Sequence, residues 1–296
     1  MKRFIFLFFV FILVKTSIAS GQIPEEKLLY PDGIKDNPII HKNSESFVDS
    51  MVNPKSLSGK NRVYSFISIP TYFLYPGSAS NNKHIGVVIY PGGGLVNNWI
   101  DKEGNDLAIW LSQKGISCLV LKYRTNEKNV KGEFLIPLST YQDAVLKDAQ
   151  TAIITLKSFS DKLLFDKNKV GIVGFSAGGW ISEKLVFKST EGTYDWTPGF
   201  VGLIYHGNNI GTFQKFKKKD KLPPFFMAAA RNDRKLPIKT VIPYLAAIAS
   251  DVNKSELHIY SKGDHGFGMA YNNGLSVDLW KESFYRWLLD IYETKY

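Results

Sequence analysis

From residue 84 onward, the sequence alternates short apolar runs with longer segments that have the spacing of amphipathic helices. Short, near-continuous apolar runs are typical of strands buried on both faces, which occur in parallel sheets covered by helices. The expected strands are Ile85–Tyr90, Ile116–Tyr123, Val170–Phe175, Phe200–Tyr205, Phe225–Ala230 and Leu257–Tyr260. The expected helices are Asp106–Gln113, Thr140–Phe159, Gly179–Lys188, Ile238–Ala249 and Ser276–Tyr292. This alternation predicts an α/β fold with a mostly parallel central sheet and helices on both faces.

The chain before this alternation is patterned less regularly. Residues 22–61 are rich in Pro, Asn, Ser and Lys, and we expect them to form an irregular lead-in. Arg62–Tyr75 has β-branched and aromatic residues around Pro70, which predicts two strands or one edge strand bent at the proline. Of the 296 residues, 44% are hydrophobic and 22% are charged, which excludes intrinsic disorder, collagen and coiled coil. Residues 62–296 are therefore expected to form a single domain.

Residues 1–21 have the layout of a secretory signal peptide. Lys2 and Arg3 precede the apolar run Phe4–Val14, and the small residues of Ser17–Gly21 offer a cleavage site. The apolar run is shorter than the roughly 20 residues that span a membrane, so we expect no stable membrane anchor. An uncleaved amphipathic anchor is the alternative. We predict that this segment is removed and that the mature protein is secreted or periplasmic.

The net charge of +10 comes from 37 basic and 27 acidic residues. The lysines are mostly scattered, and the one dense run, residues 215–221, lacks the repeated aromatic–basic interleaving of nucleic-acid-binding segments. We therefore expect a solvated loop there and no nucleic-acid partner. Cys118 is the only cysteine, so an intramolecular disulfide is excluded. It lies in an apolar run and is expected to be a buried strand residue.

A G-x-S-x-G pattern, Gly174–Gly178, stands between an expected strand and an expected helix. A serine on such a sharp strand-to-helix turn is held in a strained conformation with its hydroxyl exposed. The flanking glycines let the neighbouring backbone approach without Cβ clashes. Ser176 is therefore the candidate nucleophile.

A nucleophilic serine needs a base, and the base needs an acid that orients it. His265 lies in a Gly-rich loop just after the last expected strand and is the candidate base, with His206 as the alternative. Asp233 follows the expected strand Phe225–Ala230, at the strand end where open α/β sheets place their sites. Asp264 is a weaker candidate for the acid because a residue rarely folds back onto its neighbour's imidazole.

The triplet of glycines after Tyr90-Pro91 directly follows an expected strand. Residues without side chains expose backbone N–H groups to an oxygen that becomes negative in a transition state. We expect Gly93 and Gly94, together with the N–H of Ala177, to form an oxyanion hole. A nucleotide phosphate loop is the rival interpretation, but no Lys-Ser/Thr pair follows and no G-x-G-x-x-G fits.

The sequence resembles α/β-hydrolases of the secreted esterase/lipase group, which includes acetylxylan esterases and related carbohydrate esterases. The motifs that carry the resemblance are Tyr90–Gly94, Val120–Arg124, Gly174–Gly179, His258–Tyr260 and Gly263–Gly268. The resemblance implies an α/β-hydrolase fold whose catalytic domain spans 62–296, with Ser176 as nucleophile, Asp233 as acid and His265 as base. The chain order of these three is that of α/β-hydrolases. Leu95 stands where members often carry Tyr, and Asn232 where a second Asp is common.

The resemblance further implies a secreted serine carboxylic-ester hydrolase that removes short acyl groups, acetyl foremost. Its substrate would be an acylated carbohydrate, such as plant polysaccharide or an oligosaccharide, or a small ester. Phe175, Trp180 and Phe267 flank the candidate catalytic residues and are candidate substrate contacts. We expect no cofactor and no metal, since no H-E-x-x-H or His/Cys cluster occurs. The alternatives are a prolyl-oligopeptidase-type serine peptidase and a catalytically silent, carbohydrate-binding member of the fold.

Overall fold

The computed structural model describes residues 22–208, 210–271 and 274–292. The segment predicted to be a signal peptide, residues 1–21, lies outside the described residues. Within the described ranges, no helix has both the length and the apolar character needed to cross a membrane.

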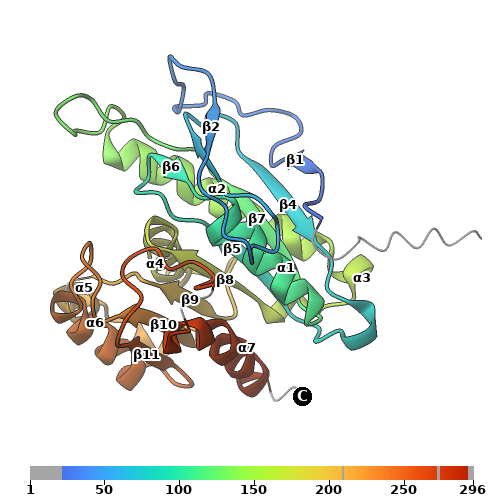
Figure 1. Ribbon diagram of the computed structural model, residues 1–296, viewed down its shortest axis with the longest axis vertical. Coiled ribbons are helices and arrows are strands. Elements are labelled where there is room, and N and C mark those ends of the chain that lie inside the picture. The colour runs from blue at the N-terminus through green and yellow to red at the C-terminus, as the bar shows by residue number, and fades with distance from the viewer. Residues whose placement is uncertain (1–21, 209, 272–273, 293–296) are drawn as a thin grey trace, which may run out of the picture.

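The described strands form an eight-stranded sheet and a separate three-stranded sheet (Figure 1). The large sheet contains β1 (Glu26–Leu28), β4 (Thr71–Tyr75), β5 (Gly86–Tyr90), β7 (Ser117–Lys122), β8 (Val170–Phe175), β9 (Val201–Ile204), β10 (Phe225–Ala230) and β11 (Glu256–Tyr260). Their spatial order is β1-β4-β7-β5-β8-β9-β10-β11. The strands from β7 to β11 in this order pair in parallel, whereas β4 and β1 are antiparallel to their neighbours. The expected mostly parallel sheet is confirmed.

Every expected helix is present in the described residues, with ends that differ by a few residues. The helices are α1 (Asp106–Gln113), α2 (Leu138–Ser158), α3 (Ser160–Leu163), α4 (Ala177–Ser189), α5 (Ile210–Lys215), α6 (Ile238–Asp251) and α7 (Trp280–Ile291). The last helix starts later than expected because residues Ser276–Leu279 form a 3₁₀ turn. The short helices α3 and α5 were not expected, since single turns leave little periodicity in a sequence.

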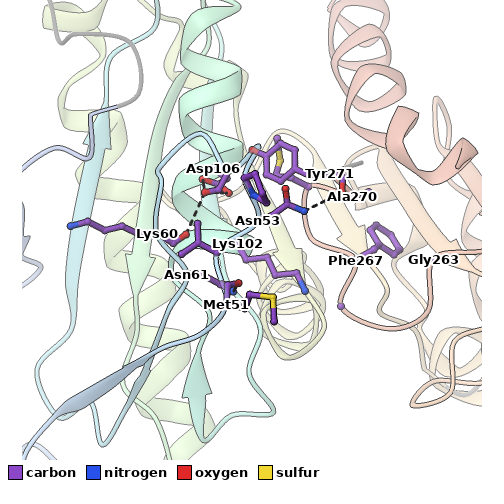
Figure 2. A pocket seen from close by; sticks show the side chains of 15 residues that line it. Met51, Asn53, Lys60, Asn61, Lys102, Asp106, Gly263, Phe267, Ala270 and Tyr271 are labelled. Atoms are coloured by element: carbon purple, nitrogen blue, oxygen red, sulfur yellow. Dashed lines mark hydrogen bonds between the residues drawn. The ribbon is translucent and has the colours of Figure 1, made fainter. Parts of the chain in front are cut away.

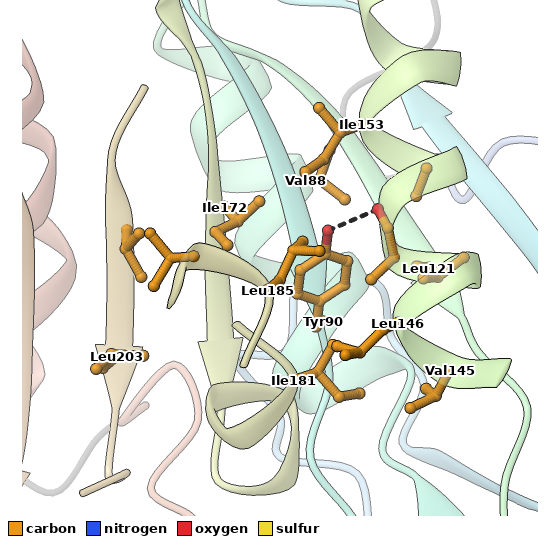
Figure 3. Packing of buried hydrophobic residues seen from close by; sticks show 14 of the residues in the cluster. Val88, Tyr90, Leu121, Val145, Leu146, Ile153, Ile172, Ile181, Leu185 and Leu203 are labelled. Carbon is orange, nitrogen blue, oxygen red and sulfur yellow. Dashed lines mark hydrogen bonds between the residues drawn. The ribbon is translucent and has the colours of Figure 1, made fainter. Parts of the chain in front are cut away.

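The central strands are buried on both faces, with one hydrophobic cluster on each. In β5, Val87 and Ile89 belong to the cluster under α1 and α7, and Val88 and Tyr90 to the cluster under α2, α4 and α6. Figure 3 shows the second cluster, in which the Tyr90 hydroxyl donates to the Ala149 carbonyl of α2 at 3.0 Å. Burial on both faces is the reason why these strands are continuously apolar in sequence.

The lead-in, residues 22–61, is more regular than we expected. Strand β1 extends the large sheet by pairing with β4. Strand β2 (Ser46–Asp49) pairs with β3 (Arg62–Ser65), and β6 (Asn97–Asn98) completes this small sheet. The rest of the segment contains neither helix nor strand, and strands of three or four residues are too short to show an alternating pattern in the sequence. Pro70 separates β3 from β4, so the region around it forms two strands.

A buried ion pair ties the lead-in to the core. The Arg124 guanidinium, just after β7, donates to both carboxylate oxygens of Asp148 in α2, at 2.9 and 2.7 Å. Both side chains are almost fully buried. From the lead-in, the Tyr30 hydroxyl donates to Asp148 at 3.0 Å, and Asn37 accepts from Arg124 at 2.7 Å. Both charged side chains therefore have several hydrogen-bond partners within the protein.

Replacing Asp148 with alanine is expected to lower the free energy of unfolding by about 3–5 kcal/mol, because it leaves the Arg124 charge buried without its partner. Urea unfolding measures the loss. Asp251→Ala is the matched control, since its pair with Lys219 is partly exposed to solvent and should contribute less than about 1 kcal/mol. Similar losses in the two variants would contradict this account of the buried pair.

Candidate active site

Ser176 lies on the sharp turn between β8 and α4. Its backbone has φ 49° and ψ −109°, a conformation that residues other than glycine rarely adopt. The backbone N–H of Ser176 donates to the Ile204 carbonyl at 3.0 Å, and its own carbonyl accepts from Trp180 at 3.1 Å. These bonds hold the strained turn, which leaves the Ser176 hydroxyl at the edge of the sheet rather than in the core.

The two glycines of the G-x-S-x-G pattern are required by close backbone approach. A Cβ atom on Gly178 would lie 1.9 Å from the Tyr90 carbonyl oxygen. A Cβ atom on Gly174 would lie 2.2 Å from the Gly178 carbonyl oxygen. No side chain fits at either position, so the pattern is a packing requirement of this turn as well as a sequence signature.

The structure brings Ser176, His265 and Asp233 into one hydrogen-bonded line. The Ser176 Oγ atom is 2.9 Å from His265 Nε2, and His265 Nδ1 is 2.7 Å from Asp233 Oδ2. The remaining oxygen of Asp233 accepts from the backbone N–H groups of Lys235 and Leu236 at 2.9 and 2.7 Å. The Asp233 carboxylate is thus buried, and both of its oxygens accept hydrogen bonds. It lies where a carboxylate can orient the His265 imidazole.

The loop of Asp233 is linked to the loop of His265 by their neighbours. Asn232 Oδ1 accepts from the Asp264 backbone N–H at 2.9 Å. Arg234 donates from Nε to Asp264 Oδ2 at 2.8 Å. The Arg234 guanidinium also holds the pKa of Asp264 well below its usual range. Asp264 therefore connects the two loops, and its carboxylate also accepts from the His265 backbone N–H at 2.8 Å, whereas the His265 imidazole is bonded to Asp233.

Gly93, Gly94 and Ala177 all lie around Ser176. Gly93 and Gly94 have positive φ values of 139° and 65°, which favour glycine, and both border the same cavity as Ser176. Ala177 is the first residue of α4, so its N–H has no acceptor within the helix. In the described residues, the N–H groups of Gly93 and Gly94 donate to no protein acceptor. The arrangement can therefore offer several donors to one oxygen at Ser176.

Glu103 is a residue of the candidate active site that no sequence motif indicated. It lies in a π-helical turn, Asp101–Asn105, that leads into α1. Its Oε2 atom accepts from the Gly92 backbone N–H at 2.8 Å, and the nearby Tyr205 hydroxyl acts to lower the pKa of the carboxyl. Burial raises the pKa of this carboxyl. Glu103 thereby fixes the start of the glycine loop, and no motif in the sequence links it to that loop.

Replacing Glu103 with glutamine is expected to lower kcat for a nitrophenyl acetate about 10- to 100-fold with little change in KM. An amide has one acceptor oxygen where the carboxylate has two, and it carries no charge, so it holds the Gly92 N–H less strongly and the glycine loop loses its fixed position. Steady-state kinetics and the rate of labelling by a fluorophosphonate measure the effect. Glu282→Gln, which alters an exposed pair with Lys114, is the control. Unchanged kcat and labelling rate would contradict a positioning role for Glu103.

Two cavities of about 390 Å³ each meet at Ser176, and their linings differ. The apolar cavity is bordered by Leu95, Trp180, Tyr205 and Leu236. The polar cavity is bordered by Asn97, Trp99, Lys102 and Glu103. Gly94, Lys235 and His265 border both. The site can therefore receive a ligand with one apolar and one polar part.

The three candidate substrate contacts have different surroundings. Trp180 borders the apolar cavity, next to Ser176. Phe267 borders a third cavity, farther along the loop of His265. Phe175 is fully buried and contacts the rings of Tyr205 and Trp280 in the core, and it borders none of these cavities. The backbone of β8 alternates its side chains, so the residue before Ser176 points into the core.

The other histidines have partners elsewhere. The pairs are His41 with Glu127, His84 with the Leu164 carbonyl, His206 with Glu183 and His258 with Glu256. His206 borders the apolar cavity, but its Nε2 atom is 3.1 Å from the Glu183 carboxylate. The alternative base is thus held as part of a buried polar group. Within the described ranges, no group of three or more His, Cys, Asp or Glu residues is arranged to hold a metal ion.

Comparison with known proteins places this geometry in context. The model of the dienelactone hydrolase family matches residues 78–286. An acetylxylan esterase of Xylanibacter ruminicola is 28% identical over 236 residues, which cover 69% of this chain and 45% of that protein. The chain therefore spans about half the length of this relative.

Solved structures with the same fold include several hydrolases. An acetyl ester-xyloside bifunctional hydrolase from Caldicellulosiruptor lactoaceticus superposes with a TM-score of 0.64 at 23% identity, covering 93% of this chain and 99% of that chain. A propionate-bound esterase from Thermogutta terrifontis gives a TM-score of 0.59 at 17% identity, covering 75% and 90%. An α/β hydrolase from a Medee basin deep-sea metagenome library gives 0.57 at 23% identity, covering 84% and 98%. The expected α/β-hydrolase fold is confirmed.

Proposed function

The chain belongs to the dienelactone hydrolase family, and we propose that it is a serine esterase that removes short acyl groups, acetyl foremost, from plant polysaccharide or oligosaccharides. The observation that carries the proposal is the line of hydrogen bonds from Ser176 Oγ through His265 to Asp233, at 2.9 and 2.7 Å. This line lies beside glycine N–H groups that have no protein acceptor in the described residues. Pure binding of a ligand requires neither feature.

In the first half of the proposed reaction, His265 Nε2 takes the proton of the Ser176 hydroxyl while Oγ attacks the ester carbonyl. The carbonyl oxygen becomes negative and accepts from the N–H groups of Gly93, Gly94 and Ala177. Asp233 keeps the imidazole proton on Nδ1 and stabilises the imidazolium that forms. His265 then gives its proton to the departing alcohol oxygen as the carbon–oxygen bond of the ester breaks, which leaves Ser176 acylated.

In the second half, water enters and His265 removes one of its protons. The hydroxide oxygen attacks the acyl carbon, the bond to Ser176 Oγ breaks, and the proton returns to that oxygen. The acid is released and the hydroxyl of Ser176 is restored. Every proton is carried by His265, and water is the co-reactant that these steps consume.

The choice of substrate rests on the relatives and on the cavities. A curated relative is named an acetylxylan esterase, and the polar cavity at Ser176 suits a hydroxyl-rich alcohol. The positively charged and apolar start of the chain, residues 1–21, supports export to where such polysaccharides occur. We therefore include a secreted or periplasmic location in the proposal.

Acetate release from acetylated xylan and from a nitrophenyl acetate tests the proposal. We expect release from both, with labelling of the folded protein by a fluorophosphonate. Activity on the nitrophenyl ester alone would remove xylan as substrate and retain the esterase. Cleavage of dipeptide amides in place of esters would favour a peptidase. Absence of both activity and labelling would favour a silent, carbohydrate-binding protein.

A further inference from the structure

A third cavity, of about 420 Å³, lies beneath residues 51–61, which we call the strap (Figure 2). The strap supplies Met51, Asn53 and Asn61 to its wall, and the loop of His265 supplies Phe267 and Tyr271. Figure 2 shows the strap and this loop on opposite sides of the cavity. Each of the three cavities falls within the size range of sites that hold drug-sized ligands.

The strap is fastened to the body of the protein, so the cavity is already formed. The Ser58 backbone N–H donates to the Asp106 carboxylate at 2.7 Å, and the Ser56 hydroxyl donates to it at 3.0 Å. Asn53 reaches the opposite wall, where it donates to the Tyr271 carbonyl at 3.3 Å. A wall held from both ends needs little reordering when a ligand binds, which favours affinity.

This cavity adjoins the polar cavity at Ser176. Lys102 and Gly266 border both of them. Gly266 directly follows His265 in the sequence, so the junction lies next to the candidate base. A ligand whose ester carbonyl is at Ser176 can thus continue through the polar cavity, past Lys102, and under the strap.

The linings indicate which part of an ester takes this route. The apolar cavity with Leu95 and Trp180 suits the acyl group. The route past Lys102 combines amide and ammonium groups with aromatic surfaces, among them Trp99 and Phe267. A sugar has the matching chemistry, since its hydroxyl groups form hydrogen bonds and its C–H faces pack on aromatic rings.

Lys102 is the charged residue at the junction. Its side chain extends across the cavity, whereas the side chain of Lys60, on the strap, points away from it (Figure 2). The Lys102 ammonium lies 5.6 Å from the centre of the Trp99 ring. It forms no ion pair among the described residues, in contrast to Lys114, Lys122 and Lys219. Its donors are available to a ligand.

We propose that the cavity under the strap binds the sugar units next to the acylated one, and that Lys102 donates hydrogen bonds to them at the junction. The inference rests on the proposed function and deepens it, because it says where the sugar units beyond the acylated one are bound. It also assigns the strap, which lies far from Ser176 in the sequence, to substrate recognition.

The test compares acetylated xylotriose with acetylated methyl xyloside, using the ratio of their kcat/KM values within each variant. Any loss common to all esters cancels in this ratio. We expect the wild type to favour the trisaccharide about tenfold or more, and Lys102→Met to lose about tenfold of this preference, as for one hydrogen bond from a charged donor. Lys102→Arg should restore part of it. Lys239→Met is the matched control and should keep the wild-type ratio, because Lys239 is exposed on α6 and borders none of the three cavities.

A wild-type ratio near one, or a ratio unchanged in Lys102→Met, would overturn the proposal. If no acetylated saccharide is cleaved, the proposed function fails and the ratio cannot be measured. A separate measurement is used in that case. Calorimetric titration of Ser176→Ala with unacetylated xylotriose then tests the cavity alone. Binding that is lost when Lys102→Met is added supports the cavity as a sugar site, and no binding to Ser176→Ala overturns it.

Discussion

Replacing Ser176 with alanine is expected to lower kcat for ester hydrolysis by about a million-fold, as loss of the nucleophile does in a comparable triad. The variant removes the Oγ atom that lies 2.9 Å from His265 Nε2 and leaves the Cβ atom of the strained turn in place. The fold should therefore persist. Release of nitrophenol under steady-state conditions, together with fluorophosphonate labelling, measures the loss.

Ser189→Ala is the matched control for this variant. Ser189 lies in the same segment, but it is buried and its hydroxyl donates to the Val186 carbonyl at the end of α4, away from the site. It should keep wild-type turnover and labelling. If Ser176→Ala retained labelling with an intact circular dichroism spectrum, another residue would have to be the nucleophile.

Replacing Asp233 with asparagine is expected to lower kcat by about ten-thousand-fold with the fold retained. The carboxylate oxygen that faces His265 Nδ1 at 2.7 Å becomes part of an amide, which stabilises the wrong tautomer and no longer stabilises the imidazolium. Turnover of a nitrophenyl acetate measures the effect, and thermal unfolding checks that the structure is intact.

Asp264→Asn is the control for Asp233→Asn. It also removes a negative charge near His265, but it leaves the hydrogen bond between Asp233 and the His265 imidazole in place. Asp264 is adjacent to His265 in sequence, but its carboxylate pairs with Arg234 on the surface. We expect Asp264→Asn to change kcat far less than Asp233→Asn. The reverse order of effects would move the role of the acid to Asp264.

Much of this structure could be predicted from local patterns. Buried strands such as Val170–Phe175 and Phe225–Ala230 have the bounds expected from their apolar runs. Residues at the carboxyl ends of parallel strands meet at one edge of the sheet, so Ser176, Asp233 and His265 could be expected to lie together. The structure places them within hydrogen-bonding distance. Their catalytic roles remain a prediction for the variants above.

Other features depend on contacts between segments that share no local signal. Glu103 and Gly92 meet because a π-helical turn folds back under the glycine loop, and neither residue type indicates the other. Arg124 belongs to a motif found in the sequence, yet its partners in α2 and the lead-in appeared only in the fold.

The sequence by itself thus determined the fold class and the three residues of the candidate triad, because the periods of strands and helices and the turn signals between them are local. Only the tertiary structure decided that β1 joins the large sheet, that Glu103 holds the glycine loop, and that the strap encloses a cavity beside Lys102. The physical reason is that these depend on pairing between distant segments, for which the local pattern of side chains carries no information about the partner.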